Sequence, residues 1–195
     1  MAEAKIYDAE LNPTKDAIAA AYSPIVKQLG SYRAVDSAGK VGIEIIVGED
    51  SEGNLTQLGV SYREAAEALD DALTPLSHSE LGERSVAYLT ADPVAVRELI
   101  ALIVSGEHGA DFSTGEPLFD VRGTGTDSEA AVTAVDIQEH NSYTSIGEAT
   151  IDGEENKFQL RLQRKVVAQQ QAGDDELALV RTDDNVTLIR LELWN

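Results

Sequence analysis

Two long runs of alternating apolar and polar residues near the end of the chain constrain its fold most. Phe158 to Gln163 and Val186 to Leu193 place every second side chain on the same face of an extended backbone. A period of two is typical of strands that bury one face and expose the other. The sequence therefore predicts an antiparallel sheet in this region.

Similar strand signals extend over most of the chain. In the first half they are separated by short links rich in turn-forming residues, such as Asp36 to Gly39 and Asp50 to Asn54. Short links imply antiparallel neighbours, because a parallel crossover needs a dozen or more residues. The expected strands cover residues 6–11, 30–35, 41–47, 55–62, 118–122, 131–137, 144–151, 157–167, 177–181 and 186–194.

Two segments carry clear helix signals. Asp92-Pro93 predicts a capped helix start, an apolar stripe follows at helical spacing, and Gly106 is placed to end the helix. Near the N-terminus, Asn12-Pro13 predicts a second helix, with Asn12 as its N-cap, that runs to Tyr22. We expect irregular structure over residues 63–89, with a short helix at 64–69.

Together these signals predict an α+β fold, with an antiparallel sheet packed with helices in the first half and a mostly β antiparallel second half. The character of the sequence changes after Gly106, where a polar, glycine-bearing stretch indicates a boundary. We therefore divide the chain into an α+β domain of residues 1–106 and a β-rich subdomain of residues 107–195.

Acidic residues outnumber basic ones by 35 to 15, which gives a formal net charge of −20. Nucleic acids and anionic lipid surfaces repel such a chain, so we expect no nucleic acid and no membrane as partners. No apolar run approaches the ~20 residues of a membrane span. The first residues lack a signal-peptide pattern, so we expect a cytoplasmic protein. The alternative that the acidic surface imitates a polyanion and binds a basic partner stays open.

The sequence offers little for catalysis or metal binding. It has no cysteine, and its histidines, His78, His108 and His140, lack the spacing of a helical zinc site. Its short carboxylate runs lie where the alternation stops and lack the ligand spacing of a calcium loop, so we interpret them as solvated turns. The segment Arg122 to Thr126 lacks the lysine and the glycine spacing of a phosphate-binding loop. We expect no metal site and no cofactor.

Four segments in the first 105 residues share their order and spacing with one known family. They are Ile6 to Lys15, Tyr32-Arg33 with Val41 to Glu44, Leu58 to Arg63, and His78 to Arg84 with Asp92-Pro93. They resemble the N-terminal cap domain of actinobacterial maltokinases, and more closely stand-alone proteins that carry this domain.

The second half of the chain is similar to the kinase N-lobe that follows the cap in the full enzymes. Glu139 to Ser145 is similar to the phosphate-binding hairpin of that lobe, and Phe158 to Leu162 to the strand that carries its ATP-contacting lysine. Arg161 occupies the lysine position, where a planar fork replaces a point charge. The resemblance thus implies a vestigial nucleotide site formed by Ser142, Thr144, Ser145 and Arg161.

The resemblance implies a non-catalytic accessory or regulatory binding protein linked to trehalose, maltose and glycogen metabolism. Because the chain ends at Asn195, we expect no C-lobe, which in this kinase class supplies the metal ligands and the catalytic base. The alternative is a nucleotide-binding or glucan-active enzyme subunit that acts with a separate chain. Exposed sheet edges would let a protein partner or a second copy bind by strand addition.

Overall fold

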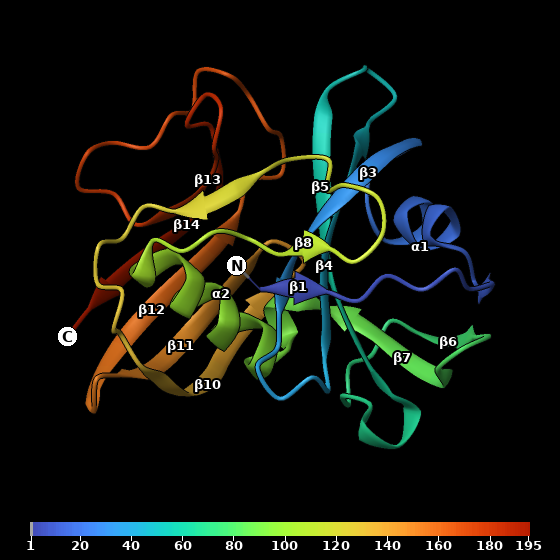
Figure 1. The fold of residues 1–195 in the computed structure, drawn as a ribbon, viewed down its shortest axis with the longest axis horizontal. Helices are drawn as coiled ribbons and strands as arrows, with labels where there is room; N and C mark the ends of the chain where they lie inside the picture. Colours follow the sequence, from blue (N-terminus) through green and yellow to red (C-terminus); the bar gives the residue numbers. More distant parts are fainter. Residues whose placement is uncertain (1) are drawn as a thin grey trace.

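Strands dominate the protein. The computed structural model describes residues 2–195, which contain fourteen strands, two α-helices and two single-turn 3-10 helices. Strands hold 47% of the residues and helices 14%. The predicted α+β fold, with a sheet packed with helices, is therefore wrong: the protein is mostly β and has three sheets (Figure 1).

The first six-stranded sheet, which we call the N-terminal sheet, is antiparallel throughout. Its strands follow the order β2-β6-β7-β5-β4-β3. They are β2 (Leu11–Asn12), β3 (Lys27–Val35), β4 (Gly42–Glu49), β5 (Leu55–Glu64), β6 (Thr74–His78) and β7 (Gly82–Tyr88).

The second six-stranded sheet, the C-terminal sheet, is a curled antiparallel layer of order β10-β11-β12-β14-β13-β9. The two alternating runs form β12 and β14, which pair with each other, so the prediction of an antiparallel sheet here is confirmed. The strands are β9 (Val121–Gly123), β10 (Val132–Asn141), β11 (Thr144–Ile151), β12 (Glu154–Leu162), β13 (Ala178–Arg181) and β14 (Thr187–Trp194).

Helix α2 (Pro93–Ser105) confirms the prediction made from its caps. The Asp92 side chain accepts a hydrogen bond from the backbone N–H of Val94 at 3.0 Å, and Gly106 ends the helix with φ of 70°. Helix α1 (Lys15–Tyr22) begins later than predicted, because Asn12 belongs to β2 and Thr14 is the N-cap. No helix within residues 2–195 is long and apolar enough to cross a membrane.

Residues 63–89, for which the sequence predicts irregular structure, supply two strands of the N-terminal sheet. Only the 3-10 helix η1 (Ala65–Glu67) forms where a helix over 64–69 is predicted, and η2 (Leu89–Ala91) precedes α2. Strand β7 lies inside the sheet, and its neighbouring residues Val86 and Ala87 are both buried. Burial on both faces removes the alternation on which the prediction depends.

Helix α2 packs between the two large sheets. Its apolar stripe is completely buried in one hydrophobic cluster with side chains of both sheets. Gln57 of β5 joins the sheets directly, because its side-chain amide donates to the backbone oxygens of Gln163 at 2.8 Å and Leu188 at 2.7 Å. One core thus contains residues from both sides of residue 106. The stripe consists of Val96, Leu99, Ile100 and Ile103.

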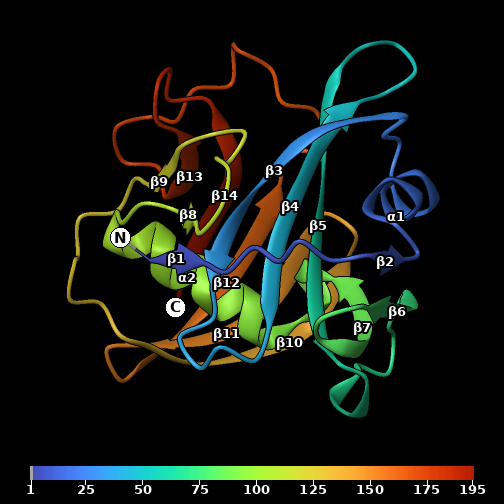
Figure 2. The same ribbon diagram turned by 45° about the vertical axis from the view of Figure 1, so that its right-hand side comes forward.

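The outer face of the N-terminal sheet, away from α2, is covered in two parts. Helix α1 covers one part, where Ile18 packs with Leu58 and Val60 in a second hydrophobic cluster. The first residues of the chain cross the other part (Figure 2), and we call residues 3–11 the strap. At the start of the strap, β1 (Glu3–Ala4) pairs in parallel with β8 (Asp111–Phe112).

Candidate functional site

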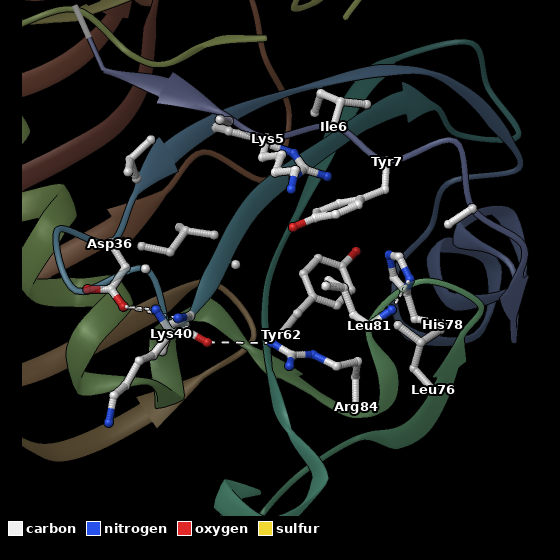
Figure 3. A pocket seen from close by; sticks show the side chains of 18 of the residues that line it. Lys5, Ile6, Tyr7, Asp36, Lys40, Tyr62, Leu76, His78, Leu81 and Arg84 are labelled. Carbon is white, nitrogen blue, oxygen red and sulfur yellow. Dashed lines mark hydrogen bonds between the residues drawn. The ribbon is translucent and has the colours of Figure 1, made fainter. Parts of the chain in front are cut away.

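A pocket of about 470 Å³ lies between the strap and the outer face of the N-terminal sheet (Figure 3). Residues of the strap, of β3 to β7 and of the turn between β3 and β4 line it. The volume falls within the range of small-molecule sites, roughly 300–1,000 Å³. This pocket is therefore the candidate site.

The strap is fastened on either side of the pocket. At one end, the backbone N–H of Ile6 donates to Ser113 Oγ at 2.8 Å. At the other, Glu10 and Ser79 exchange two hydrogen bonds, both at 3.0 Å, one through the backbone oxygen of Glu10 and one through Ser79 Oγ. Among residues 2–195, none forms a backbone hydrogen bond to Tyr7, Asp8 or Ala9. The middle of the strap thus spans the pocket without backbone support.

A buried carboxylate lies behind the pocket floor, in contact with three residues that line the pocket, Lys15, Arg33 and Tyr62. Glu44 of β4 has a side chain with no exposed surface. Its Oε1 accepts hydrogen bonds from Lys15 Nζ and Ser31 Oγ, both at 2.7 Å. Its Oε2 accepts one from the Tyr62 hydroxyl at 2.9 Å and lies 3.1 Å from Arg33 Nη2. We call these five residues the Glu44 network.

The charges of the Glu44 network fix its protonation. Burial raises the pKa of Glu44, but the positive charges of Arg33 and Lys15, with hydrogen bonds from Lys15 and Ser31, outweigh this effect and lower the pKa to about 2. Burial, and then the negative charge of Glu44, raises the pKa of Tyr62 well above its ordinary value. Near neutral pH, Glu44 is ionised and Tyr62 keeps its proton.

His78 and Arg84 line another side of the pocket. His78 Nδ1 accepts hydrogen bonds from the backbone N–H groups of Glu80 and Leu81, both at 3.2 Å. Burial lowers the pKa of His78, and the charge of Arg84 lowers it further. The His78 ring meets the ring of Tyr7 edge-on, with centres 5.5 Å apart. His78 is therefore neutral near pH 7 and lines the pocket with an aromatic ring beside Tyr7.

The pocket is rich in basic side chains although the protein is strongly acidic. Its lining includes five of the fifteen basic residues but only three of the thirty-five acidic ones. With Glu44 behind the floor, the formal charge of this group is +1, whereas the remaining residues carry −21. The basic residues are Lys5, Lys15, Arg33, Lys40 and Arg84, and the acidic lining residues are Glu3, Asp36 and Glu64.

Two arginines of the pocket have donors that are not used. The Nε atoms of Arg33 and Arg84 are buried and have no hydrogen-bond acceptor among residues 2–195. Arg84 Nη2 lies 3.5 Å from the backbone oxygen of Lys40, and Nη1 lies 4.0 Å from the exposed carboxylate of Glu64. In Figure 3, Arg84 lies close to Tyr62, and Tyr7 extends from the strap toward both. A buried donor without an acceptor is unfavourable, and both Nε atoms have almost no accessible surface, so a bound molecule would contact the exposed parts of these two side chains instead.

The four segments that resemble the maltokinase cap converge on this pocket. The opening segment, the central strands and the strand ending in Arg63 meet in the Glu44 network, and the fourth segment lines the pocket beside it. The strand segment also joins α2, because the Arg63 guanidinium forms two hydrogen bonds with Asp92, at 2.6 and 2.7 Å. The residues at the pocket are Lys15, Arg33, Glu44, Tyr62, His78 and Arg84.

The four residues of the predicted nucleotide site lie elsewhere, on the β10–β11 turn and on β11 and β12. Thr144 and Arg161 are direct cross-strand neighbours. Ser142 lies in the turn after β10, and Ser145 is fully buried, on the opposite face of β11 from Thr144. Arg161 is exposed and donates to Gln159 Oε1 at 3.0 Å. The structure thus brings Thr144 and Arg161 together, turns Ser145 away, and places none of the four in the pocket.

Residues 2–195 hold no cluster of three or more His, Asp or Glu side chains placed to bind a metal ion. No model of a known protein family matches the chain, and no curated protein matches it. The resemblance to the maltokinase cap therefore stays a prediction from the sequence.

Proposed function

We propose that this protein is a non-catalytic accessory or regulatory binding protein of the maltokinase-cap type, and that the pocket beneath the strap is its binding site. Its context would be cytoplasmic trehalose, maltose or glycogen metabolism, as the resemblance implies. One observation carries the proposal: residues from all four resembling segments, between positions 15 and 84, meet at this pocket.

The convergence has a physical basis in the buried carboxylate. Removing one partner of a buried ion pair leaves the other charge uncompensated, which is strongly destabilising. Glu44 therefore needs Lys15 and Arg33 together, although they come from separate segments. If the four segments resemble the cap because the fold is of the cap type, we expect them to meet in the structure. If the four resemblances arose independently by chance, there is no reason for the segments to meet.

The protonation of the pocket supports a binding role over a catalytic one. A general acid or base works best when its pKa lies near the operating pH. Glu44, with a pKa of about 2, and Tyr62, whose pKa is raised well above its usual value, both lie far from neutrality. The Nδ1 atom of His78 is occupied by the backbone of the following turn.

The proposal is tested by calorimetry with glucose, maltose, trehalose and their phosphates, and by affinity capture of enzymes of this metabolism. Ala9→Trp should block the pocket from the strap, whereas Ala66→Trp places the same ring on the exposed helix η1. We expect saturable binding that Ala9→Trp abolishes and Ala66→Trp preserves. Absence of both a ligand and a captured enzyme would overturn the proposal, and sugar phosphorylation by the chain alone would overturn its non-catalytic part.

A nucleotide-binding subunit is the second candidate, favoured by the cross-strand placement of Thr144 and Arg161. Mg-ATP should then bind to the wild type and to Ala9→Trp, because the hairpin lies outside the pocket, but not to Arg161→Ala. No heat and no thermal shift at millimolar Mg-ATP would remove this candidate.

We further propose β10 as the strand to which a protein partner or a second copy would add. It forms an edge of the C-terminal sheet, and most of its side chains are exposed. An open edge presents unpaired backbone groups that can pair with another strand. Light scattering after gel filtration tests self-association, and a monomer at every concentration would exclude it.

A further inference from the structure

We infer that the pocket beneath the strap binds a small organic oxyanion, a molecule that joins a phosphate or carboxylate group to a body with apolar or ring surface. The inference rests on the proposed function and names the chemical class of its ligand. It depends on three properties of the pocket: its charge, its two arginine side chains and its size.

The charge of the pocket floor favours an anion. Lys15 and Arg33 bring two positive charges to Glu44, which supplies one negative charge, so the floor keeps a formal charge of +1. The side chain of Arg33 is only 16% exposed. An ion pair formed there is weakened less by water than a pair on the open surface. A ligand with one or two negative charges would balance this excess.

The two arginines that line the pocket, Arg33 and Arg84, can give the anion a defined binding geometry. A guanidinium group presents its N–H donors in a planar fork that matches the oxygens of carboxylate and phosphate groups. Arg33 is held in position by Glu44 through Nη2 and keeps a small exposed surface at the pocket. Arg84, 11% exposed, makes no polar contact shorter than 3.5 Å through its terminal nitrogens, so a ligand would have little competition for them. Because Arg33 is already ordered, an oxyanion that it binds loses less free energy to side-chain ordering.

The size and lining of the pocket call for more than an inorganic ion. A volume of about 470 Å³ corresponds to roughly fifteen water molecules at about 30 Å³ each. The rings of Tyr7 and Tyr62 face the cavity together with apolar side chains such as Leu76 and Leu81 (Figure 3). These surfaces suit the carbon skeleton or ring of a metabolite, with the oxyanion directed toward the arginines.

Pairs of probe molecules with the same sugar or aromatic ring, one neutral and one negatively charged, test the inference. Calorimetric titrations at physiological salt would compare glucose with glucose 6-phosphate and glucuronate, and phenol with phenyl phosphate and benzoate. Inorganic phosphate serves as the ion without a body. We expect at least one charged member to bind tenfold or more tightly than its neutral partner, and more tightly than inorganic phosphate.

Two substitutions that change the net charge equally locate the binding. Arg84→Gln removes a pocket cation whose polar contacts are no shorter than 3.5 Å, so the fold should tolerate it. Lys27→Gln removes a lysine on β3 that is 64% exposed and pairs with Glu49, outside the pocket. We expect Arg84→Gln to weaken the charged probes at least tenfold and Lys27→Gln less than twofold. Circular dichroism and thermal melts check that both variants fold.

The results distinguish a failure of the oxyanion inference from a failure of the proposed binding function. Equal binding of neutral and charged probes would overturn the oxyanion inference, and if Ala9→Trp abolishes that binding, the proposed binding function still holds. Equal losses in Arg84→Gln and Lys27→Gln would show that the overall charge acts rather than the pocket. Failure of every probe at roughly 10 mM would overturn the inference, and the proposed function falls with it only if the capture experiment is also negative.

Discussion

Replacing Glu44 with glutamine tests the central element of the site. The substitution keeps the size of the side chain and removes its negative charge. Every close polar partner of Glu44 donates to it or is positively charged, from Lys15 and Arg33 to Ser31 and Tyr62. The amide oxygen of glutamine could still accept from some of them. Its NH₂ group, however, would face donors, and two cations would lose their counter-ion.

The expected loss of stability follows from the pKa of Glu44. Its ordinary value is 4.5 and its value in the folded protein is about 2. At about 1.4 kcal/mol for each pH unit, this difference stabilises the folded state by roughly 3 kcal/mol at pH 7. Because the folded pKa is the lower one, this contribution is complete above about pH 4.5 and is lost as the pH falls toward 2. By pH 3 about 1 kcal/mol remains.

The assay is urea denaturation of the wild type and Glu44→Gln at pH 7 and at pH 3, followed by circular dichroism. We expect the variant to lose about 3 kcal/mol at pH 7 and much less at pH 3. Glu49→Gln is the matched control, since Glu49 lies on the same strand and pairs with Lys27 at the surface. Such a pair contributes about 0–1 kcal/mol. Equal losses for the two variants, or a loss for Glu44→Gln that does not shrink in acid, would refute the reasoning.

Three further predictions concern other parts of the fold. Asp92→Ala removes the N-cap of α2 and the counter-ion of the largely buried Arg63, so chemical denaturation should show a loss of about 3 kcal/mol or more, and a loss below about 1 kcal/mol would contradict this. Gly106→Ala should destabilise more than Gly39→Ala, because both glycines have φ near +70° but only at Gly106 would the new Cβ collide with a backbone oxygen; equal shifts in melting temperature would show that the chain relaxes. The folded pKa of His78 is lowered, so the stability that its neutral form contributes is complete above about pH 6.5 and declines as the pH falls toward the folded value. The denaturation midpoint of the wild type should therefore fall more between pH 7 and 5 than that of His78→Asn, and parallel curves would argue against this.

The elements that could be predicted from the sequence are those with local signals. Asp92 and Gly106 mark the ends of α2 because a cap acts within one turn of its helix. Strand β11 has the predicted bounds, Thr144–Ile151, and the alternating runs form β12 and β14. In each case the residues within about ten positions of the element are enough to predict its type and its approximate bounds.

The fold class could not be predicted in the same way, because it depends on two strands without a local signal. Val86 and Ala87 are adjacent in β7 and both buried, so the segment lacks the alternation of a half-exposed strand. Its pairing with β5 and β6 becomes visible only in the assembled sheet. Without these strands, the two helix signals weigh too heavily and lead to an α+β prediction.

The basic pocket could not be predicted from the net charge of the chain, because the net charge is a sum over all residues. A net charge of −20 describes the whole surface and conceals five basic side chains that meet only after folding. One signal was present, since Lys15, Arg33 and Arg84 all lie in segments that resemble the maltokinase cap. That resemblance directs attention to the first half of the chain, but it does not reveal that these cations share a cavity.

An acidic surface and a pocket for anions are physically compatible. The surface charges act on a ligand from a distance and are screened by salt, whereas the basic side chains of the pocket would act on it at contact. At physiological salt, charges separated by more than about 8 Å are largely screened in water. A nucleic acid must contact an extended surface and would meet the remaining charge of −21. A small anion in the pocket would instead meet the local charge of +1 that the lining residues and Glu44 carry together. Repulsion of a polyanion by the surface is therefore no argument against the proposed binding of a metabolite that carries a single phosphate or carboxylate.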